Sequence, residues 1–127
     1  MGRLRRGLAM GGGVFCRDGF VTRGGVRLPG AQLGGGLFLR GAQLDNPDGE
    51  ALIADNATTP VIDLSGGFHA RGTVRLRGAR VSDLLTFDGA TLDGTGTALF
   101  GVGMQVGTFD LGLAAKPPAR WISRAPR

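Results

Sequence analysis

Apolar residues alternate with polar or small residues over short stretches of about five residues, and a glycine closes many of these stretches. In residues 26–30, Val26 and Leu28 flank Arg27, and Gly30 follows; in residues 90–94 the same pattern recurs. Two apolar residues separated by one polar residue indicate extended backbone, because successive side chains of a strand point to opposite faces. Glycine permits the sharp bend that would follow. The pattern therefore predicts very short strands joined by corners, and it does not fit a helix.

The pattern is organised as a long internal repeat. Residues 19–44 align without a gap with residues 67–92, at a constant offset of 48, and thirteen of the 26 aligned positions are identical. Self-similarity at a fixed period is typical of repeat architectures. Eight pairs of corresponding apolar residues are predicted to point inward: Val26/Val74, Leu28/Leu76, Ala31/Ala79, Leu33/Val81, Leu37/Leu85, Leu39/Phe87, Ala42/Ala90 and Leu44/Leu92. Outward positions hold mainly polar residues, with Phe38 the main exception: Arg27, Gln32, Gln43, Arg75, Arg77, Arg80, Asp88 and Asp93.

These units resemble the pentapeptide-repeat proteins, whose pattern is a small residue, a polar one, Leu or Phe, a polar one and Gly. Residues 42–45 (Ala-Gln-Leu-Asp), 79–83 (Ala-Arg-Val-Ser-Asp) and 90–94 (Ala-Thr-Leu-Asp-Gly) carry the resemblance. The longer unit that begins at Arg17 is similar to a family of actinobacterial Gly-rich repeat proteins, whose members are often labelled oxidoreductase or membrane-associated oxidoreductase. The resemblance covers about residues 12–111. It implies an all-β fold, a right-handed, four-sided β-helix (β-solenoid) of about two 48-residue units, with two coils in each unit.

The repeat also divides the chain. Residues 12–112 are predicted to form the solenoid, between a basic N-terminal end (residues 1–11) and a basic, Pro-containing tail (residues 113–127), both expected to be disordered. Within the solenoid, the sequence Asn-Pro-Asp-Gly at residues 46–49 is a strong turn signal and predicts an insertion at a corner. Residues 56–60 are expected to form a second irregular corner.

Charge and composition narrow the classes of function. The formal net charge is +5, but seven of the fifteen basic residues lie in the two ends, and residues 7–115 contain eight Arg and ten Asp or Glu. The body is therefore slightly acidic, and we expect no nucleic-acid groove. No stretch is long and apolar enough to cross a bilayer, and residues 1–15 match a signal peptide poorly. The expected location is the cytoplasm, with peripheral contact to a membrane left open.

The candidate chemistry is sparse. The glycine triplets at residues 11–13 and 34–36 do not extend to a dinucleotide fingerprint, and Lys116 is the single lysine, without a phosphate loop. Cys16 is predicted to be a buried, inert thiol, and His69 a solvated side chain at a corner. We therefore predict no catalytic, cofactor-binding or metal-binding residue. An acidic group that could weakly chelate Ca²⁺ is interpreted instead as turn chemistry: Asp45, Asp48, Glu50 and Asp55.

A possible interaction face is predicted from Arg27, Arg75, Arg77 and Arg80, which should make one side basic, while Asp45, Asp88 and Asp93 make another more acidic. The leading hypothesis is a non-catalytic structural or protein-interaction solenoid with an unknown protein partner, and a segment of a longer repeat protein is left open. Either end-to-end self-association or marginal stability is expected, because the end coils would expose unpaired strand edges. The alternatives are an oxidoreductase, as the resembled family is labelled, and peripheral binding of an anionic surface through Arg.

Overall fold

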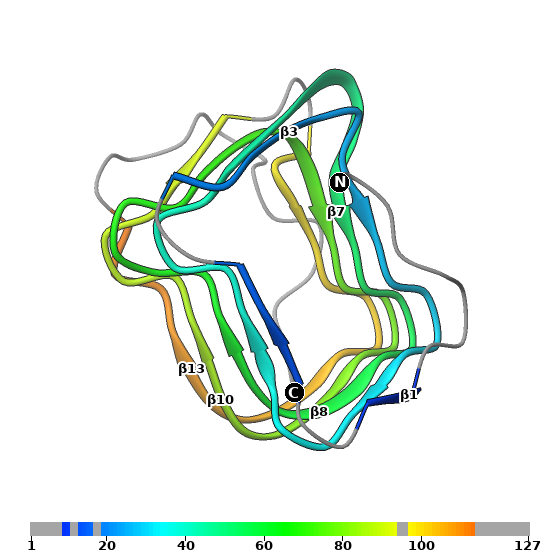
Figure 1. Cartoon of the computed structure of the whole chain (residues 1–127). Coiled ribbons are helices and arrows are strands. Elements are labelled where there is room, and N and C mark those ends of the chain that lie inside the picture. The colour runs from blue at the N-terminus through cyan, green and yellow to red at the C-terminus, as the bar shows by residue number, and fades with distance from the viewer. Residues whose placement is uncertain (1–8, 11–12, 17–18, 94–96, 114–127) are drawn as a thin grey trace.

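A computed structural model describes residues 9–10, 13–16, 19–93 and 97–113 of the chain. Within these residues the chain forms thirteen strands and no helix, and it winds in about four turns as a β-solenoid. Figure 1 looks along the solenoid, so that the turns overlap. All strand pairs in the described residues are parallel. The predicted all-β solenoid is confirmed.

The strands belong to two sheets that the chain visits alternately. Sheet A contains β1 (Ala9–Met10), β2 (Val14–Phe15), β5 (Gln32–Leu33), β6 (Leu37–Phe38), β8 (Thr58–Asp63), β10 (Arg80–Thr86) and β13 (Gln105–Asp110). Sheet B contains β3 (Val21–Arg23), β4 (Val26–Arg27), β7 (Gln43–Ile53), β9 (His69–Arg75), β11 (Thr91–Leu92) and β12 (Leu99–Phe100). One passage through each sheet makes one turn, and the strands of successive turns pair side by side.

The strand register explains the 48-residue spacing of the sequence repeat. Val21 pairs with Gln43, Gln43 with His69, and His69 with Thr91, so the successive turns at this position are 22, 26 and 22 residues long. Gln43 and Thr91 therefore lie two turns apart. The sequence repeats every two turns rather than every turn because shorter and longer turns alternate.

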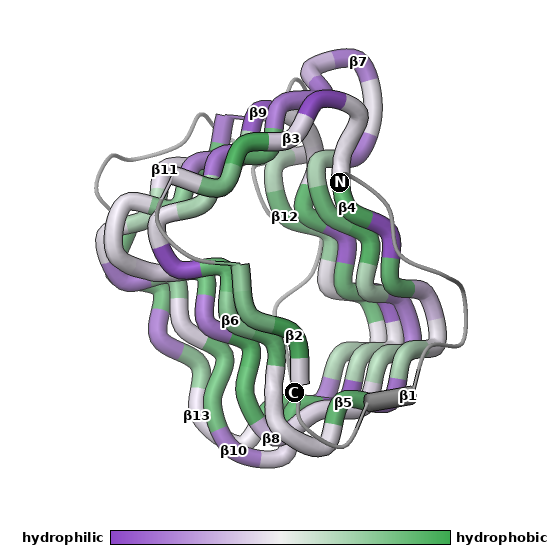
Figure 2. Tube along the Cα trace, viewed as in Figure 1, coloured by the Kyte–Doolittle hydropathy of each residue, from purple (hydrophilic) through white to green (hydrophobic). Residues whose placement is uncertain are grey.

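The extra residues of the long turn through β7 lie in one segment of sheet B, between Asp45 and Leu52. Asp45 and Leu52 are seven positions apart in β7, whereas their partners Arg71 and Val74 are three positions apart in β9. The additional residues form an excursion, the β7 connector (residues 46–49), which rises away from the other turns in Figure 2. The predicted insertion at these residues is confirmed.

The expectation of an irregular corner at residues 56–60 is wrong. Asn56 occupies a regular corner, and residues 58–60 form the start of β8. Asn56 is accepted there because asparagine tolerates the left-handed backbone conformation better than other residues with a side chain.

Seven corners are closed by the same hydrogen bond, which joins the first and the fourth residue of the corner. In each, the residue that closes the turn donates its N–H to the carbonyl three residues earlier, at N···O distances of 2.8–3.2 Å. The third residue of each turn has a positive φ, and it is Gly in six corners and Asn56, with φ 58°, in the seventh. The closing residues are Ala31, Ala42, Ala57, Phe68, Ala79, Ala90 and Met104. The regular spacing of glycine in the sequence therefore reflects the corners of the coil.

The closing residues also reveal a shorter unit, the half-turn. They follow one another at intervals of 11, 15, 11, 11, 11 and 14 residues, so a basic half-turn has eleven residues. The two longer intervals both begin in sheet B, where the chain carries its extra residues. Because both sheets are built from the same unit, sheet A and sheet B are related by an approximate half-turn rotation about the solenoid axis.

The interior is an apolar column. All sixteen residues that the repeat predicts to point inward are buried, and Phe68 and Phe87 are among the largest fully buried side chains. Among the described residues, the buried polar side chains are Thr22, Thr59, Ser65 and Thr86. The predicted division into inward and outward positions is confirmed, and each turn relies on its neighbours for burial of its apolar face.

The ends of the chain are described in part. Residues 9–10, within the stretch expected to precede the solenoid, form β1 and pair with β5. The rest of the two basic ends, residues 1–8 and 114–127, lies outside the described residues, and Trp121 with them. Within the described part of the chain, no helix is long and apolar enough to span a membrane.

Candidate interaction surface

The four predicted arginines lie on two sides of the solenoid and the corner between them. Arg27 and Arg75 belong to one row on the outer face of sheet B, in which Arg27 pairs with Ile53, Ile53 with Arg75, and Arg75 with Phe100. Arg77 follows at the corner, and Arg80 lies on β10 of sheet A. The structure therefore does not place them on one flat side, as the alignment of the two repeats suggested.

Arg75 is engaged by its own chain. Its Nε lies 2.8 Å from Asp55 Oδ2, and its Cζ lies 5.5 Å from the centroid of the Phe100 ring. The other oxygen of Asp55 accepts a hydrogen bond from the Arg77 backbone N–H at 3.1 Å. Arg75 and Asp55 together connect three successive turns at this corner. Arg27, Arg77 and Arg80 are exposed.

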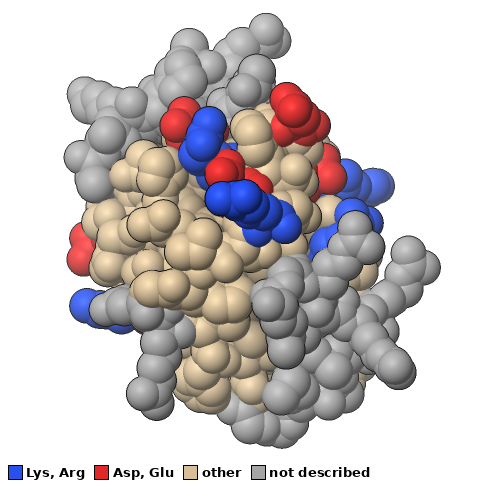
Figure 3. Space-filling view, turned by 45° about the horizontal axis from the view of Figure 1, so that its top comes forward, with Lys and Arg blue, Asp and Glu red and all other residues tan. Residues whose placement is uncertain are grey.

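A second row on the outer face of sheet B alternates in charge. Arg23 pairs in register with Asp45, and Asp45 with Arg71. Asp93 continues the row, because it follows Leu92, the register partner of Ala70. The two acidic residues of this row therefore do not form a separate acidic face, and Figure 3 shows red and blue side chains interleaved on this part of the surface.

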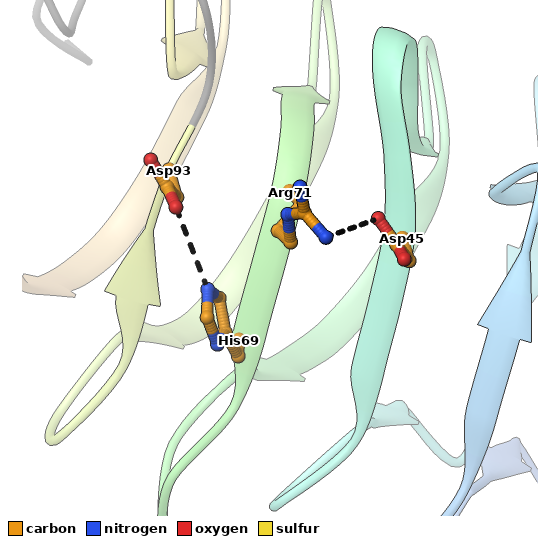
Figure 4. Close-up of polar contacts among 4 residues, drawn as sticks. All are labelled: Asp45, His69, Arg71 and Asp93. Atoms are coloured by element: carbon orange, nitrogen blue, oxygen red, sulfur yellow. Dashed lines mark ion pairs between the residues drawn. The ribbon is translucent and has the colours of Figure 1, made fainter.

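Two ion pairs cross the strands of this row. Arg71 Nη1 lies 3.4 Å from Asp45 Oδ1, and His69 Nε2 lies 3.9 Å from Asp93 Oδ2 (Figure 4). The side chains are partly exposed, so each pair contributes at most about 1 kcal/mol. Sequence reasoning missed these pairs because their members lie more than twenty residues apart, and only the register of the turns brings them together.

An aromatic pair occupies the outer face of sheet A at its first turns. The rings of Phe15 and Phe38 stack with centroids 4.9 Å apart and an interplanar angle of 2°. Phe15 is 62% exposed and is one of two large exposed apolar residues in the described chain. The signal in the sequence was Phe38, which is the main apolar residue at an outward position.

A polar cluster holds the corner after β8. The Ser65 hydroxyl and backbone N–H both donate to Asp63 Oδ1, and Arg40 Nη1 donates to Ser65 Oγ at 3.4 Å. A carboxylate that accepts hydrogen bonds from a residue two positions later is typical of a turn. Because these hydrogen bonds join Arg40, Asp63 and Ser65, they fix the corner.

The two candidate nucleophiles are in unpromising positions. Cys16 is half-buried against the core, and burial raises the pKa of its thiol, which leaves little reactive thiolate at neutral pH. His69 lies at the start of β9 and not at a corner, which corrects the expectation, and it faces Asp93. Among the residues that the structure describes, no three His, Cys, Asp or Glu side chains gather closely enough to hold a metal ion.

Each sheet ends in strands that, in the described chain, have a neighbour on one side only. At the first turn these are β1 and β2 in sheet A and β3 and β4 in sheet B; at the last turn they are β13 in sheet A and β11 and β12 in sheet B. Apolar side chains near these edges are only partly buried: Cys16 and Phe20 at the first turn, and Val106, Phe109, Leu111 and Leu113 at the last.

Comparison of the chain with protein-family models, curated proteins and solved structures gave no match.

Proposed function

We propose that the protein is a non-catalytic β-solenoid that serves as a rigid structural and protein-interaction module. The observation that carries the proposal is the set of buried side chains, whose polar members among the described residues are three Thr and one Ser. Acid–base and nucleophilic catalysis depend on titratable groups held in a shielded site. The described Asp, Glu, His and Arg side chains instead lie at the outer face and the corners, and the Cys16 thiol, which packs against the core, has a raised pKa.

The corner that carries Arg77 is the proposed docking surface for a protein partner. Arg77 is exposed there, and the exposed Arg27 and Arg80 lie on the two adjoining sides. Three positive charges without a described ion-pair partner favour an acidic segment, because complementary charge accelerates encounter and fixes orientation. We place this partner in the cytoplasm, and we propose common ancestry with the pentapeptide-repeat proteins on the strength of the five-residue units.

The test of the non-catalytic role is direct. Protein purified under native conditions is examined by absorbance spectroscopy and native mass spectrometry for a flavin, a nicotinamide or a metal. We expect the mass of the chain alone and no visible absorbance. A cofactor present at one equivalent would overturn the proposal and favour the oxidoreductase that the family label implies.

Binding to an anionic lipid surface is the second candidate, and the exposure of Arg27, Arg77 and Arg80 favours it. Sedimentation with phosphatidylglycerol vesicles at low and at physiological salt tests it, with phosphatidylcholine vesicles as the control. If the arginines bind lipid, Arg77→Asp lowers the bound fraction and salt weakens binding. Equal sedimentation with both lipids would contradict this candidate.

A further inference from the structure

We propose that copies of this chain associate head to tail, with the last turn of one copy against the first turn of the next, and with the second copy rotated by a half-turn about the solenoid axis. The inference deepens the proposed structural role, on which it rests, by naming a second copy as a partner. It starts from the two edges, where strands of the described chain have a neighbour on one side only. Exposed strand edges are templates for pairing with another chain.

The shapes of the two edges determine the rotation. At the first turn, β1 and β2 of sheet A have β3 and β4 of sheet B at the same level. At the last turn, sheet A continues past β10 to β13, whereas sheet B of the described chain ends with β11 and β12, at the level of β10. If β3 of an unrotated second copy paired with β11, its β1 and β2 would fall at the level that β13 already occupies. After a half-turn rotation, β1 and β2 continue sheet B, while β3 and β4 continue sheet A beyond β13.

The eleven-residue half-turn keeps the register intact under this rotation. Phe38 in sheet A and Arg75 in sheet B occupy equivalent positions, because each is the last strand residue directly before a corner turn, which begins at Leu39 and at Leu76. Each outer row of one copy can therefore continue in the row of the other sheet in the second copy. At this position before the corner, the outer row of sheet A ends in Asp110 at the last turn. The outer row of sheet B ends in Phe100.

Both rows find complementary neighbours in the second copy. The sheet A row ends in the exposed carboxylate of Asp110 and continues in the exposed guanidinium of Arg27. The sheet B row ends in Phe100 and continues in Phe15, which is 62% exposed. Phe15 already stacks on Phe38 within its own chain, so Phe100 would meet an aromatic ring in the arrangement that this fold uses elsewhere.

The apolar column continues across the same junction. Phe109 pairs in register with Leu85 and occupies the inward position that Val26 fills in β4, so Phe109 would pack over Val26 of the second copy. Phe109 and Val106 are only partly buried in the single chain. Covering them removes apolar surface from water, which supplies the driving force of the contact, while the Arg27–Asp110 pair selects the register.

The experiment is sedimentation velocity over a concentration series of the full chain. We expect the wild-type protein to increase in mass with concentration. Arg27→Asp and Asp110→Arg each place like charges together, so each should raise the dissociation constant by about tenfold or more. The double variant restores opposite charges and should associate about as tightly as the wild type.

Arg80→Asp is the matched control. Arg80 is an exposed arginine of β10, and its register neighbours Thr58 and Gln105 belong to the same chain. This variant should associate like the wild type, and circular dichroism of each variant establishes that it is folded. A wild-type protein that stays monomeric throughout overturns the association, and a double variant that is not restored overturns the register.

Disulfide cross-linking between two copies gives a second measurement, which can be made even if a substitution lowers the stability of the fold. In a Cys16→Ser background, Phe15→Cys and Phe100→Cys are made in separate chains. Neighbouring strands lie within the Cα separation that a disulfide accepts, so the mixture should give cross-linked pairs of the two chains under mild oxidation. Cross-linking no greater in the mixture than in either chain alone overturns the rotated arrangement. A bound cofactor would overturn the non-catalytic role without changing either readout.

Discussion

Asn56 stands where the other six corners of this type have glycine. Its backbone has φ 58°, its N–H donates to the Arg77 carbonyl at 2.7 Å, and its side-chain Oδ1 occupies the space that a Cβ on Gly78 would need. The Asn56 side chain therefore packs against the Cα of Gly78 in the next turn. A residue with a Cβ at position 78 would clash with Asn56.

We expect Asn56→Gly to leave the free energy of unfolding nearly unchanged, because glycine adopts the same backbone conformation. Asn56→Ala should lower it by about 1 kcal/mol, since alanine is strained at positive φ. Urea unfolding followed by circular dichroism measures both. Equal stability of the two variants would contradict a left-handed residue at this corner.

Thr22 is a polar residue in an apolar column. It points inward at the level of Leu44, Ala70 and Leu92, it is 5% exposed, and its hydroxyl has no hydrogen-bond partner among the described residues. An unpaired buried hydroxyl costs free energy, because its hydrogen bond to water is lost on folding.

Thr22→Val keeps the shape of the side chain and removes the hydroxyl, so it should raise the free energy of unfolding by about 1 kcal/mol. Thr59→Val is the control. Thr59 is also buried, but its hydroxyl donates to the Val61 carbonyl at 3.1 Å, and its replacement should be neutral or destabilising. Chemical denaturation of both variants checks the difference, and the opposite order would show that the Thr22 hydroxyl is satisfied.

At the scale of elements, the β7 connector is an addition to a solenoid that can close without it. In the shorter turns above and below, three steps suffice from Arg23 to Val26 and from Arg71 to Val74. The side chain of Asn46 closes the connector, since its Nδ2 donates to the Glu50 carbonyl at 3.0 Å. The residues it adds contribute little to the apolar column.

Removing residues 46–48 together with Glu50 joins Asp45 to Gly49 and reproduces the spacing of β9. Gly49 then takes the position of Gly72, which has φ 122°. We expect a folded solenoid whose thermal midpoint changes by only a few degrees, because long surface connectors contribute mainly chain entropy. Removing residues 46–49 instead leaves Glu50 at that position, and this variant should be less stable. Thermal unfolding compares the two.

The strands and corners could be predicted from the sequence, whereas the contacts between side chains of different turns could not. Inward positions and corners follow from local signals, namely apolar residues two apart and a glycine where the backbone turns left-handed. The ion pair between Arg75 and Asp55 and the charge row through Asp45 and Arg71 depend on which turn lies beside which. That register depends on turn length, which alternates with the connectors, so the outward position of Arg75 was predicted and its partners were not.

At the scale of the molecule, stability is a property of neighbouring turns. Each interior turn is covered on both sides, and long-range strand pairs such as β7 with β9 and β8 with β10 hold the structure together. In such one-dimensional assemblies, stability is close to a sum over turns and the interfaces between them.

Duplication of residues 42–89, inserted after Gly89, should therefore give a folded protein with two additional turns. The junction joins two equivalent corners, since Ala42 and Ala90 both close the same turn. We expect a higher urea midpoint and a larger denaturant dependence, because more surface is exposed on unfolding. Duplication of residues 68–89, a single turn, is the comparison and should stabilise less. A lower midpoint for the longer protein would contradict additive turns.

The alternation of short and long turns has a consequence for how such a chain can grow by recombination. A crossover between corresponding points of the two repeats changes the coding sequence by 144 nucleotides and preserves the order of short and long connectors. A crossover that duplicates a long turn alone would bring two bulky connectors into adjacent layers, where they compete for the same space. Duplication of a short and a long turn together keeps the long connectors one layer apart, so growth in paired layers avoids this steric penalty wherever the crossover falls.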